Sequence, residues 1–333
     1  METPSTQIII EDKEKKIRFK SNALQQFLAF ASLIVMVIFF SLASPNFFQF
    51  DNIIGILLST SVIGILALGA TFIIITSGID LSVGTVMTLT SVMTGIFITS
   101  MGLPVIVGVI GGILTGAVAG LISGLAIAKM NIPPFIATLA MMMIAKGLAL
   151  VISGAAPIYF TASPEFTKIA MGNIIPGLKI PNAVLIFFVM AIIAGIILNK
   201  TIIGRYTFAL GSNEEATRLS GVNVNKWKII IYVLAGVFTG IAGLVMAARL
   251  NSAQPALGQG YELEAIAAVV IGGTSLAGGK GTILGTVIGA MIMSVLTNGL
   301  RIMSVPQEWQ TVVVGIVILF AVYTDVLRNK KAK

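Results

Sequence analysis

The hydrophobic pattern of this chain consists of long apolar runs separated by short segments that contain charged residues, Pro or Gly. A run of about 20 apolar residues is long enough for a helix to cross a hydrocarbon core about 30 Å thick. The runs predict ten candidate spans, near residues 23–43, 53–77, 81–100, 104–128, 134–153, 183–198, 229–248, 265–279, 282–299 and 309–327. The third, eighth and ninth have weak edges, because Gly, Ser and Thr interrupt them, and broken helices occur at membrane depth only where protein or water surrounds them. The predicted fold class is an all-α polytopic membrane protein with about ten transmembrane helices.

The first apolar run permits a second interpretation. Residues 1–22 are polar and basic, residues 23–43 are apolar, and Ser41-Leu42-Ala43 has the small residues of a signal-peptide cleavage site. The apolar core of a signal peptide is usually 7–15 residues long. The run here is longer, which favours a first helix that is retained in the membrane.

Basic residues predict the orientation, since cytoplasmic loops of membrane proteins are enriched in Lys and Arg. Sixteen fall on one side if the ten spans alternate, namely Lys13, Lys15, Lys16, Arg18, Lys20, Lys129, Lys200, Arg205, Arg218, Lys226, Lys228, Lys280, Arg328, Lys330, Lys331 and Lys333. The other side holds four, Lys168, Lys179, Arg249 and Arg301, while Lys146 falls within a span. We therefore expect a cytoplasmic tail over 1–22, a transmembrane domain over 23–327 and a cytoplasmic tail over 328–333.

Two connections are too long to be simple turns. The external loop 154–182 contains four prolines, so we expect it to be irregular or to hold short surface helices. The cytoplasmic loop 199–228 contains the segment Glu214–Leu219, which favours a short helix with Ser212 or Asn213 as its N-cap and Gly221 as its stop.

Glycine recurs at every fourth residue in two of the runs. Gly108, Gly112, Gly116, Gly120 and Gly124 lie in the fourth span, and Gly281, Gly285 and Gly289 lie in the ninth. Such spacing lets helix backbones approach closely; the alternative interpretation is a thin wall beside a pore. Because the two spans are five apart, they would run in opposite directions, which suggests an inverted repeat of five plus five helices.

The amino-acid composition excludes several classes of function. The chain has no Cys and no His, which excludes thiolate or imidazole metal sites and catalysis by a Ser-His-Asp or Cys-His arrangement. Its net charge of +8 would suggest nucleic-acid binding in a soluble protein. With only 10% charged residues, the better explanation is a set of basic cytoplasmic loops in a lipid bilayer, so no nucleic-acid partner is expected.

Few charged residues lie at membrane depth. The segment Gly78-Ile79-Asp80-Leu81-Ser82-Val83-Gly84 joins the second and third spans, and an acid there is a candidate for a transport pathway. The alternative is that Asp80 caps the third helix, with Ser82 in its first turn. Lys146 is the one basic residue inside a span, where it would extend to the interface, pair with an acid or contact a substrate.

Energy coupling must therefore come from outside the chain, or transport must be passive. Proton- or sodium-driven carriers usually need several intramembrane acids or histidines. The segment Gly278-Gly279-Lys280-Gly281-Thr282 fails the spacing of a nucleotide-binding loop. A carrier that works alone, ion-coupled or passive, remains the alternative function, whereas an integral membrane enzyme would need paired catalytic groups that the sequence does not offer.

Several motifs together resemble the permease subunit of bacterial ATP-driven sugar importers of the ribose type. They are Gly69-Ala70-Thr71 with Gly78–Gly84, then Ile132-Pro133-Pro134-Phe135-Ile136-Ala137-Thr138-Leu139, Gly211–Gly221 and Gly272–Thr282. They extend over about residues 50–325. Two positions depart from the family pattern: Lys146 stands before Gly147 in place of Arg, and Arg301 follows Leu300, where ribose members often have Asn.

The resemblance implies a permease like that of a type II ABC importer, working as a homodimer in the bacterial inner membrane with both termini cytoplasmic. It implies an external sugar-binding protein and a cytoplasmic tandem ATPase, which would use ATP and Mg²⁺ while this chain holds no cofactor. Gly211–Gly221 would be the helix that contacts the ATPase. Its expected contact residues are Ser212, Asn213, Glu214, Glu215, Arg218 and Leu219. Transport of ribose or a similar small sugar or polyol would proceed by alternating access.

Overall fold

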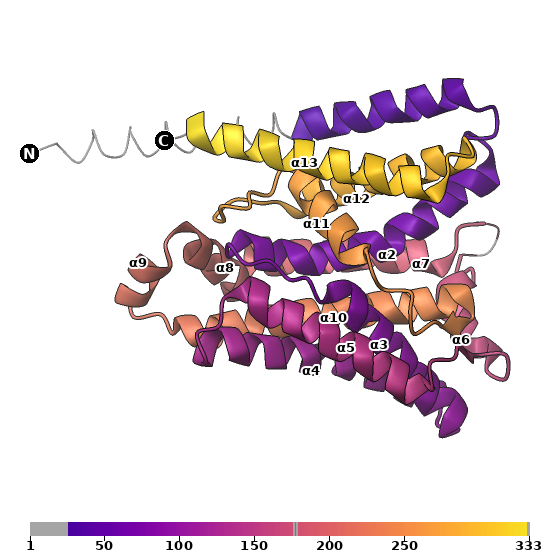
Figure 1. Ribbon diagram of the computed structural model, residues 1–333, viewed down its shortest axis with the longest axis horizontal. Coiled ribbons are helices and arrows are strands. Elements are labelled where there is room, and N and C mark those ends of the chain that lie inside the picture. The colour runs from indigo at the N-terminus through magenta and orange to yellow at the C-terminus, as the bar shows by residue number, and fades with distance from the viewer. Residues whose placement is uncertain (1–25, 176, 178, 332–333) are drawn as a thin grey trace, which may run out of the picture.

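The computed structural model describes residues 26–175, 177 and 179–331, and it is almost entirely helical (Figure 1). A first helix, Gln26–Ala43, precedes the labelled ones. The labelled helices are α2 (Phe50–Ile75), α3 (Val83–Gly95), α4 (Val105–Lys129), α5 (Pro134–Ser153), α6 (Pro164–Met171), α7 (Asn182–Lys200), α8 (Ile202–Ser212), α9 (Glu214–Leu219), α10 (Val224–Leu250), α11 (Tyr261–Ile271), α12 (Ile283–Ile302) and α13 (Gln307–Lys331). Two short strands, β1 (Ile158–Tyr159) and β2 (Ser252–Ala253), pair in antiparallel fashion.

Within the described residues, nine helices are long and apolar enough to cross a membrane. The expected eighth span, 265–279, is wrong as a continuous helix. The observed helix there, α11, has 11 residues and is about 16 Å long, too short to cross a bilayer. It is followed by a non-helical segment through Thr282, which has glycines at positive φ at Gly273, Gly278 and Gly279. The interrupted edges noted in the sequence thus mark a helix that covers only about half the bilayer.

Other boundaries also differ from the sequence prediction. The expected third span begins two residues later than predicted, at Val83, and changes from α-helix to a π-helix, η1, over Ile96–Ser100. Helix α13 continues to Lys331, into the segment 328–333 that was predicted to be a tail. The predicted tail 1–22 lies outside the described residues.

The helices run roughly along the long axis of the molecule, which gives it two ends (Figure 1). Helices α8 and α9 lie at one end, here called the α9 side, and α6 lies at the other, the α6 side. The side chain of Gln26 donates a hydrogen bond to Thr282 (3.0 Å), next to the start of α12, and α13 ends on the same side. Both described ends of the chain therefore lie on the α9 side.

The centre of the bundle is formed by α2 and α10. Residues 65–75 of α2 are buried throughout, and Phe72 meets Phe238 of α10 with ring centroids 6.2 Å apart. Large apolar side chains are exposed instead on the outer helices, such as Ile106 on α4, Ile192 on α7 and Leu319 on α13. Exposed apolar faces around a buried core are what a lipid-facing bundle requires.

The glycine spacing of the fourth span serves close helix packing. A Cβ atom at Gly116 of α4 would overlap the carbonyl oxygen of Gly236 of α10, and one at Gly236 would overlap that of Gly116. In the ninth span, a Cβ atom at Gly289 would overlap the carbonyl oxygen of Ala268 in α11. The interpretation as tight packing is confirmed, because backbone lies against backbone at Gly116, Gly120 and Gly124 of the first stripe and at Gly285 and Gly289 of the second.

Helix packing also shows an internal repeat. Helix α4 packs along α10, and α12 packs along α2; α3 contacts α10, and α11 contacts α2. Helix α5 covers α3 and α4 as α13 covers α11 and α12. Since α2 runs toward the α9 side and α10 away from it, the units α2–α5 and α10–α13 are inverted relative to each other (Figure 1). The first helix packs on α12, whereas α7 packs mainly on α2, so these two helices, which precede the two units in the chain, do not repeat each other's contacts.

The long loop 154–182 contains ordered structure, as expected. It holds β1 and the short helix α6, which is anchored by Phe166 and Phe160, both fully buried with ring centroids 4.2 Å apart. Strand β1 pairs with β2 just beyond the end of α10. The loop is thereby fixed on the α6 side of the bundle.

Candidate functional site

The short helix on the α9 side forms as the sequence predicts. The Asn213 side chain accepts a hydrogen bond from the backbone N–H of Ala216 (2.9 Å), so Asn213 rather than Ser212 is the N-cap of α9. Gly221, at φ +83°, follows its C-cap residue. Thr217 is buried, so its side of the helix faces the bundle, and its hydroxyl donates to the carbonyl of the N-cap residue Asn213 (2.8 Å).

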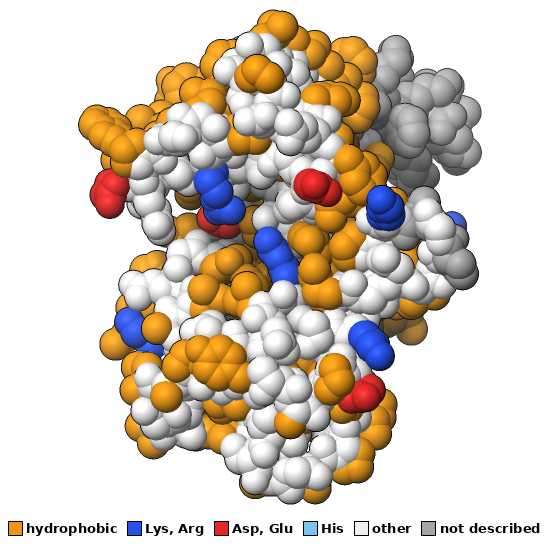
Figure 2. All heavy atoms as spheres, turned by 90° about the vertical axis from the view of Figure 1, so that its right-hand side faces the viewer, with side chains coloured by type: hydrophobic (Ala, Val, Ile, Leu, Met, Phe, Trp, Pro, Cys, Tyr) orange, Lys and Arg blue, Asp and Glu red, His pale blue; other side chains and the backbone are white. Residues whose placement is uncertain are grey.

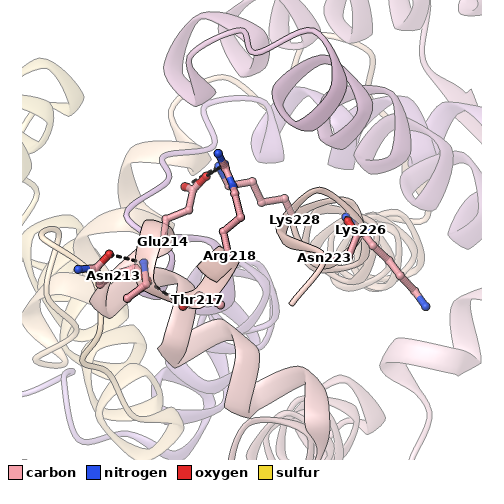
Figure 3. A network of polar contacts seen from close by, with 8 residues as sticks. Asn213, Glu214, Thr217, Arg218, Asn223, Lys226 and Lys228 are labelled. Atoms are coloured by element: carbon pink, nitrogen blue, oxygen red, sulfur yellow. Dashed lines mark hydrogen bonds and ion pairs between the residues drawn. The ribbon is translucent and has the colours of Figure 1, made fainter. Parts of the chain in front are cut away.

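The charged residues of α9 have different roles in the structure. Glu214 accepts from Arg218 within the helix (3.1 Å) and forms an ion pair with Lys228 of α10 (2.7 Å), as Figure 3 shows. Glu215 is exposed and makes no ion pair within the described part of the chain. Leu219 is 83% exposed, although it is apolar. The surface that α9 presents outward therefore consists of Glu215, Leu219 and the guanidinium of Arg218.

The residues just before α9 are locked to the end of another helix. A Cβ atom at Gly211 would overlap the carbonyl oxygen of Ile75, the last residue of α2. The same carbonyl accepts a hydrogen bond from Gly279 (2.9 Å), and Ser77 donates to the carbonyl of Ala277 (2.9 Å). Three segments far apart in sequence thus meet at one point.

After α2 the chain turns back into the bundle. Asp80 is only 8% exposed, and its Oδ1 accepts hydrogen bonds from the backbone N–H (2.8 Å) and the hydroxyl (2.6 Å) of Ser82. A carboxylate taken out of water is costly unless such bonds replace its hydration. Ser82 is the N-cap residue of α3, and the Asp80 carboxylate bonds to Ser82 rather than to an N–H group of the helix itself, so it holds the residues that lead into α3.

A second loop enters the bundle from the opposite side. Residues 251–260 lead from the end of α10 to α11, and the carboxylate of Glu262 accepts from the N–H of Gly260 (3.0 Å). The two loops meet where Gly84 of α3 lies against Gly258, so closely that a Cβ on either would overlap the other's carbonyl oxygen. Gly78 lies in the first of these loops, and a Cβ there would come within 2.8 Å of the Tyr232 hydroxyl.

Lys146 lies beside this meeting point. Its Nζ donates a hydrogen bond to Oε1 of Gln259 in the second loop (3.2 Å), and both side chains are partly or fully exposed. The expectation that Lys146 pairs with an acid is wrong within the described residues, since its partner is a neutral amide.

The α6 side carries its own charged groups. Figure 2 views this face and shows acidic and basic side chains spread across its middle, with apolar side chains around them. Arg249 at the end of α10 approaches the hydroxyl of Ser59 in α2 (3.5 Å). A surface depression nearby is lined by residues of the 154–182 loop and by Asn251. Among the described residues, no three His, Cys, Asp or Glu side chains lie close enough to hold a metal ion.

Sequence reasoning missed Gln259 and Glu262. One signal could have found Glu262, although not Gln259: Gly78-Ile79-Asp80-Leu81 and Gly260-Tyr261-Glu262-Leu263 share the pattern Gly, any residue, acid, Leu, and each lies at the start of the second helix of one repeat.

Comparison with known proteins agrees with this architecture. Residues 52–322 match the family described as the permease component of branched-chain amino acid transport systems. The chain is 44% identical to the ribose import permease protein of Escherichia coli K12 over 90% of this chain and 92% of that protein. It is 43% identical to the ribose import permease protein of Bacillus subtilis 168 over 97% and 98% of the two chains. It is 35% identical to the xylose transport system permease protein of Haemophilus influenzae over 94% and 99%.

No solved structure matches the chain. The permease match covers most of the sequence and all the helices described from α3 to α12, and it identifies a multi-pass transport subunit rather than an enzyme. The chain therefore belongs to this permease family, among the ribose-type sugar permeases of ABC importers.

Proposed function

We propose that this chain is the membrane subunit of an ATP-driven importer of ribose or a similar small sugar. The observation that carries the proposal is its identity of 43–44% to two ribose import permeases over nine tenths or more of its length. The family description refers to branched-chain amino acids, but relatives at 35% identity or above are named for ribose, xylose, fructose and allose.

In this proposal the α9 side faces the cytoplasm of a bacterial cell and the α6 side faces outward across the inner membrane. Charge supports it, since Lys129, Lys200, Arg205 and Lys226 lie in α8 or at helix ends on the α9 side, and basic residues are enriched in cytoplasmic segments. An external sugar-binding protein would then dock on the α6 side. A tandem ATPase that binds ATP and Mg²⁺ would dock beneath α9, and the chain itself would need no cofactor.

The exposed residues of α9 would contact the ATPase. Glu215 and Leu219 are exposed, and Arg218 is 64% exposed although it bonds to Glu214; an apolar side chain as exposed as Leu219 is suited to a pocket on a partner. Glu214 also forms an ion pair with Lys228 that links α9 to α10. A substitution at Glu214 would therefore displace the helix as well as change its surface.

Alternating access would follow from the contact between Gly211, Ile75 and Gly279. A partner shifts a conformation only if it binds the two states with different affinity. ATP-bound and nucleotide-free states of the ATPase would hold α9 differently, and the locked backbone contacts would carry the motion to α2 and the loop after it. We propose that two copies of the chain rock in this way around a shared axis.

The test is transport by the assembled complex. The chain is purified gently from its host with its associated proteins, reconstituted into liposomes and supplied with labelled ribose. We expect uptake that requires ATP on the α9 side of the membrane and the sugar-binding protein on the α6 side. Uptake by the chain alone without nucleotide would contradict the proposal and support a carrier that works by itself.

The contact of α9 has a more specific test. Glu215→Arg combined with Leu219→Asp should abolish co-purification of the ATPase, while the matched change Lys226→Asp, on the exposed first turn of α10, should leave it largely intact. Both variants must insert in the membrane to the same level. Retention of the ATPase by the double variant would exclude α9 as its docking helix.

A further inference from the structure

Two breaks in the helical bundle come together inside it, because Gly84, just after the first break, lies against Gly258 in the second. Helix α5 has 20 residues, and Lys146 is its thirteenth, about 18 Å from Pro134 along the helix. Two turns earlier in α5, the Thr138 hydroxyl accepts from the N–H of Leu81 (3.2 Å) in the loop that enters from the α9 side. The loop that enters from the α6 side brings Gln259 to Lys146.

Polar groups at this depth need an environment other than lipid. Non-helical backbone at membrane depth is tolerated only where protein buries it or where it lines a water-filled cavity. The loop before α3 meets the first condition, because Asp80 and Ser82 are buried and bonded to each other. The loop before α11 does not, since Gln259 is exposed on the surface of this single chain, as is Leu263 in the first turn of α11.

The position of Lys146 also indicates that this part of the surface faces water or protein rather than lipid. An ionisable group inside a transmembrane helix is rare and costly, and it usually faces a water-filled or protein-lined space. Lys146 cannot reach either end of α5 by extending along it, and the structure shows it bonded sideways to Gln259. Next to it, Gly147 leaves open space, with no heavy atom within 4 Å of a Cβ atom placed there.

We infer that Lys146 and Gln259 form a sugar-contacting site at the middle of the translocation pathway, on the face that the chain turns toward the pathway. Lys146 offers three N–H donors, and Gln259 offers two donors and an acceptor. A neutral polyhydroxylated solute can exchange hydrogen bonds with both, and it brings no charge of its own into the site. The inference rests on the proposed transport function and adds the residues that would meet the substrate inside the membrane.

Water accessibility tests the position of the site independently of transport. The chain has no cysteine, so single Lys146→Cys and Gln259→Cys variants can be labelled cleanly with a charged, membrane-impermeant thiol reagent. The control is Val118→Cys, an exposed position near the middle of α4. In the assembled complex we expect both site variants to react much faster than the control. Reaction of Lys146→Cys no faster than Val118→Cys would overturn the inference.

Transport tests the role of the site. In the reconstituted complex, Lys146→Met should lower sugar uptake by roughly tenfold or more, as loss of a hydrogen bond from a charged group implies. Lys146→Arg should restore most of it, and the control Lys179→Met, on an exposed lysine of the 154–182 loop, should change little. ATP hydrolysis stimulated by the loaded binding protein should persist in all three. Undiminished uptake by Lys146→Met would overturn the inference, whereas absence of uptake by the unmodified complex would instead contradict the proposed function.

Discussion

Asp80 is the residue whose role the structure changes most. The sequence leaves open a pathway role and a capping role, because an acid at membrane depth suits both. In the structure its carboxylate is buried and both of its hydrogen bonds go to Ser82. A group with this environment holds a loop in place, and a solute on the surface would not reach it.

Two substitutions of Asp80 distinguish the contribution of its charge to stability from that of its hydrogen bonds. Asp80→Ala leaves the N–H and hydroxyl of Ser82 without their acceptor, which should lower stability by about 1–3 kcal/mol. Asp80→Asn keeps an acceptor oxygen and should lose less. Thermal unfolding of the detergent-solubilised protein measures both. Equal destabilisation by the two variants would mean that the negative charge, rather than the bonding geometry, is what the loop needs.

Single residues also show where sequence reasoning reaches its limit. The cap at Asn213 and the stop at Gly221 were predictable, because both depend on local backbone chemistry within one turn. The pairing of Glu214 with Lys228 and of Lys146 with Gln259 was not, since the partners come from different elements. Gln259 carries no charge, so a search for intramembrane charges passes over it.

At the scale of the elements, apolar runs predict continuous helices well and broken helices poorly. The run 104–128 is observed as α4 within one residue at each end. The run 265–279 was counted as a span because its residues are apolar, but its last eight residues are not helical. Hydropathy reports only how apolar a segment is, and a loop that is buried in the bundle can be as apolar as a helix.

The stripe of glycines in α4 makes a sharp prediction. Gly116→Ala places a methyl group where the backbone of α10 lies, so the two helices must separate, and we expect a loss of about 1–3 kcal/mol. Gly195→Ala in α7 is the control, because nothing lies within 4 Å of its added Cβ. Thermal unfolding in the same detergent compares the two. A melting temperature for Gly116→Ala as high as that of the control would contradict close packing at this position.

At the scale of the whole molecule, the inverted repeat explains why the loop after α2 and the loop after α10 meet inside the bundle. The loop after α2 enters from the α9 side and the loop after α10 enters from the α6 side. A twofold relation between the two repeats therefore brings the starts of α3 and α11 together, as the contact of Gly84 with Gly258 shows. Glycine at both positions allows the two loops to lie in backbone contact.

This arrangement joins the α9 side to the centre of the bundle through a short series of contacts. Gly211 lies against Ile75, the segment after Ile75 leads to Asp80, and α3 begins at Val83 beside Gly258. Gln259, which contacts Lys146, follows directly. The first and last steps of this series are backbone contacts, of Gly211 with Ile75 and of Gly84 with Gly258, and the non-helical segment 76–82 joins them.

Gly211 is the position at which to test this connection. Gly211→Ala places a Cβ atom on the carbonyl oxygen of Ile75, which must push α8 and α9 away from the end of α2. The outward surface of α9, with Glu215 and Leu219, is unchanged, so the ATPase should still co-purify. We expect basal ATP hydrolysis to persist while sugar uptake per ATP hydrolysed falls several-fold, which is measured by counting both in the same liposomes. Gly195→Ala should keep the ratio of the unmodified complex. An unchanged ratio in Gly211→Ala would show that the force from the ATPase reaches the pathway by a route other than the end of α2.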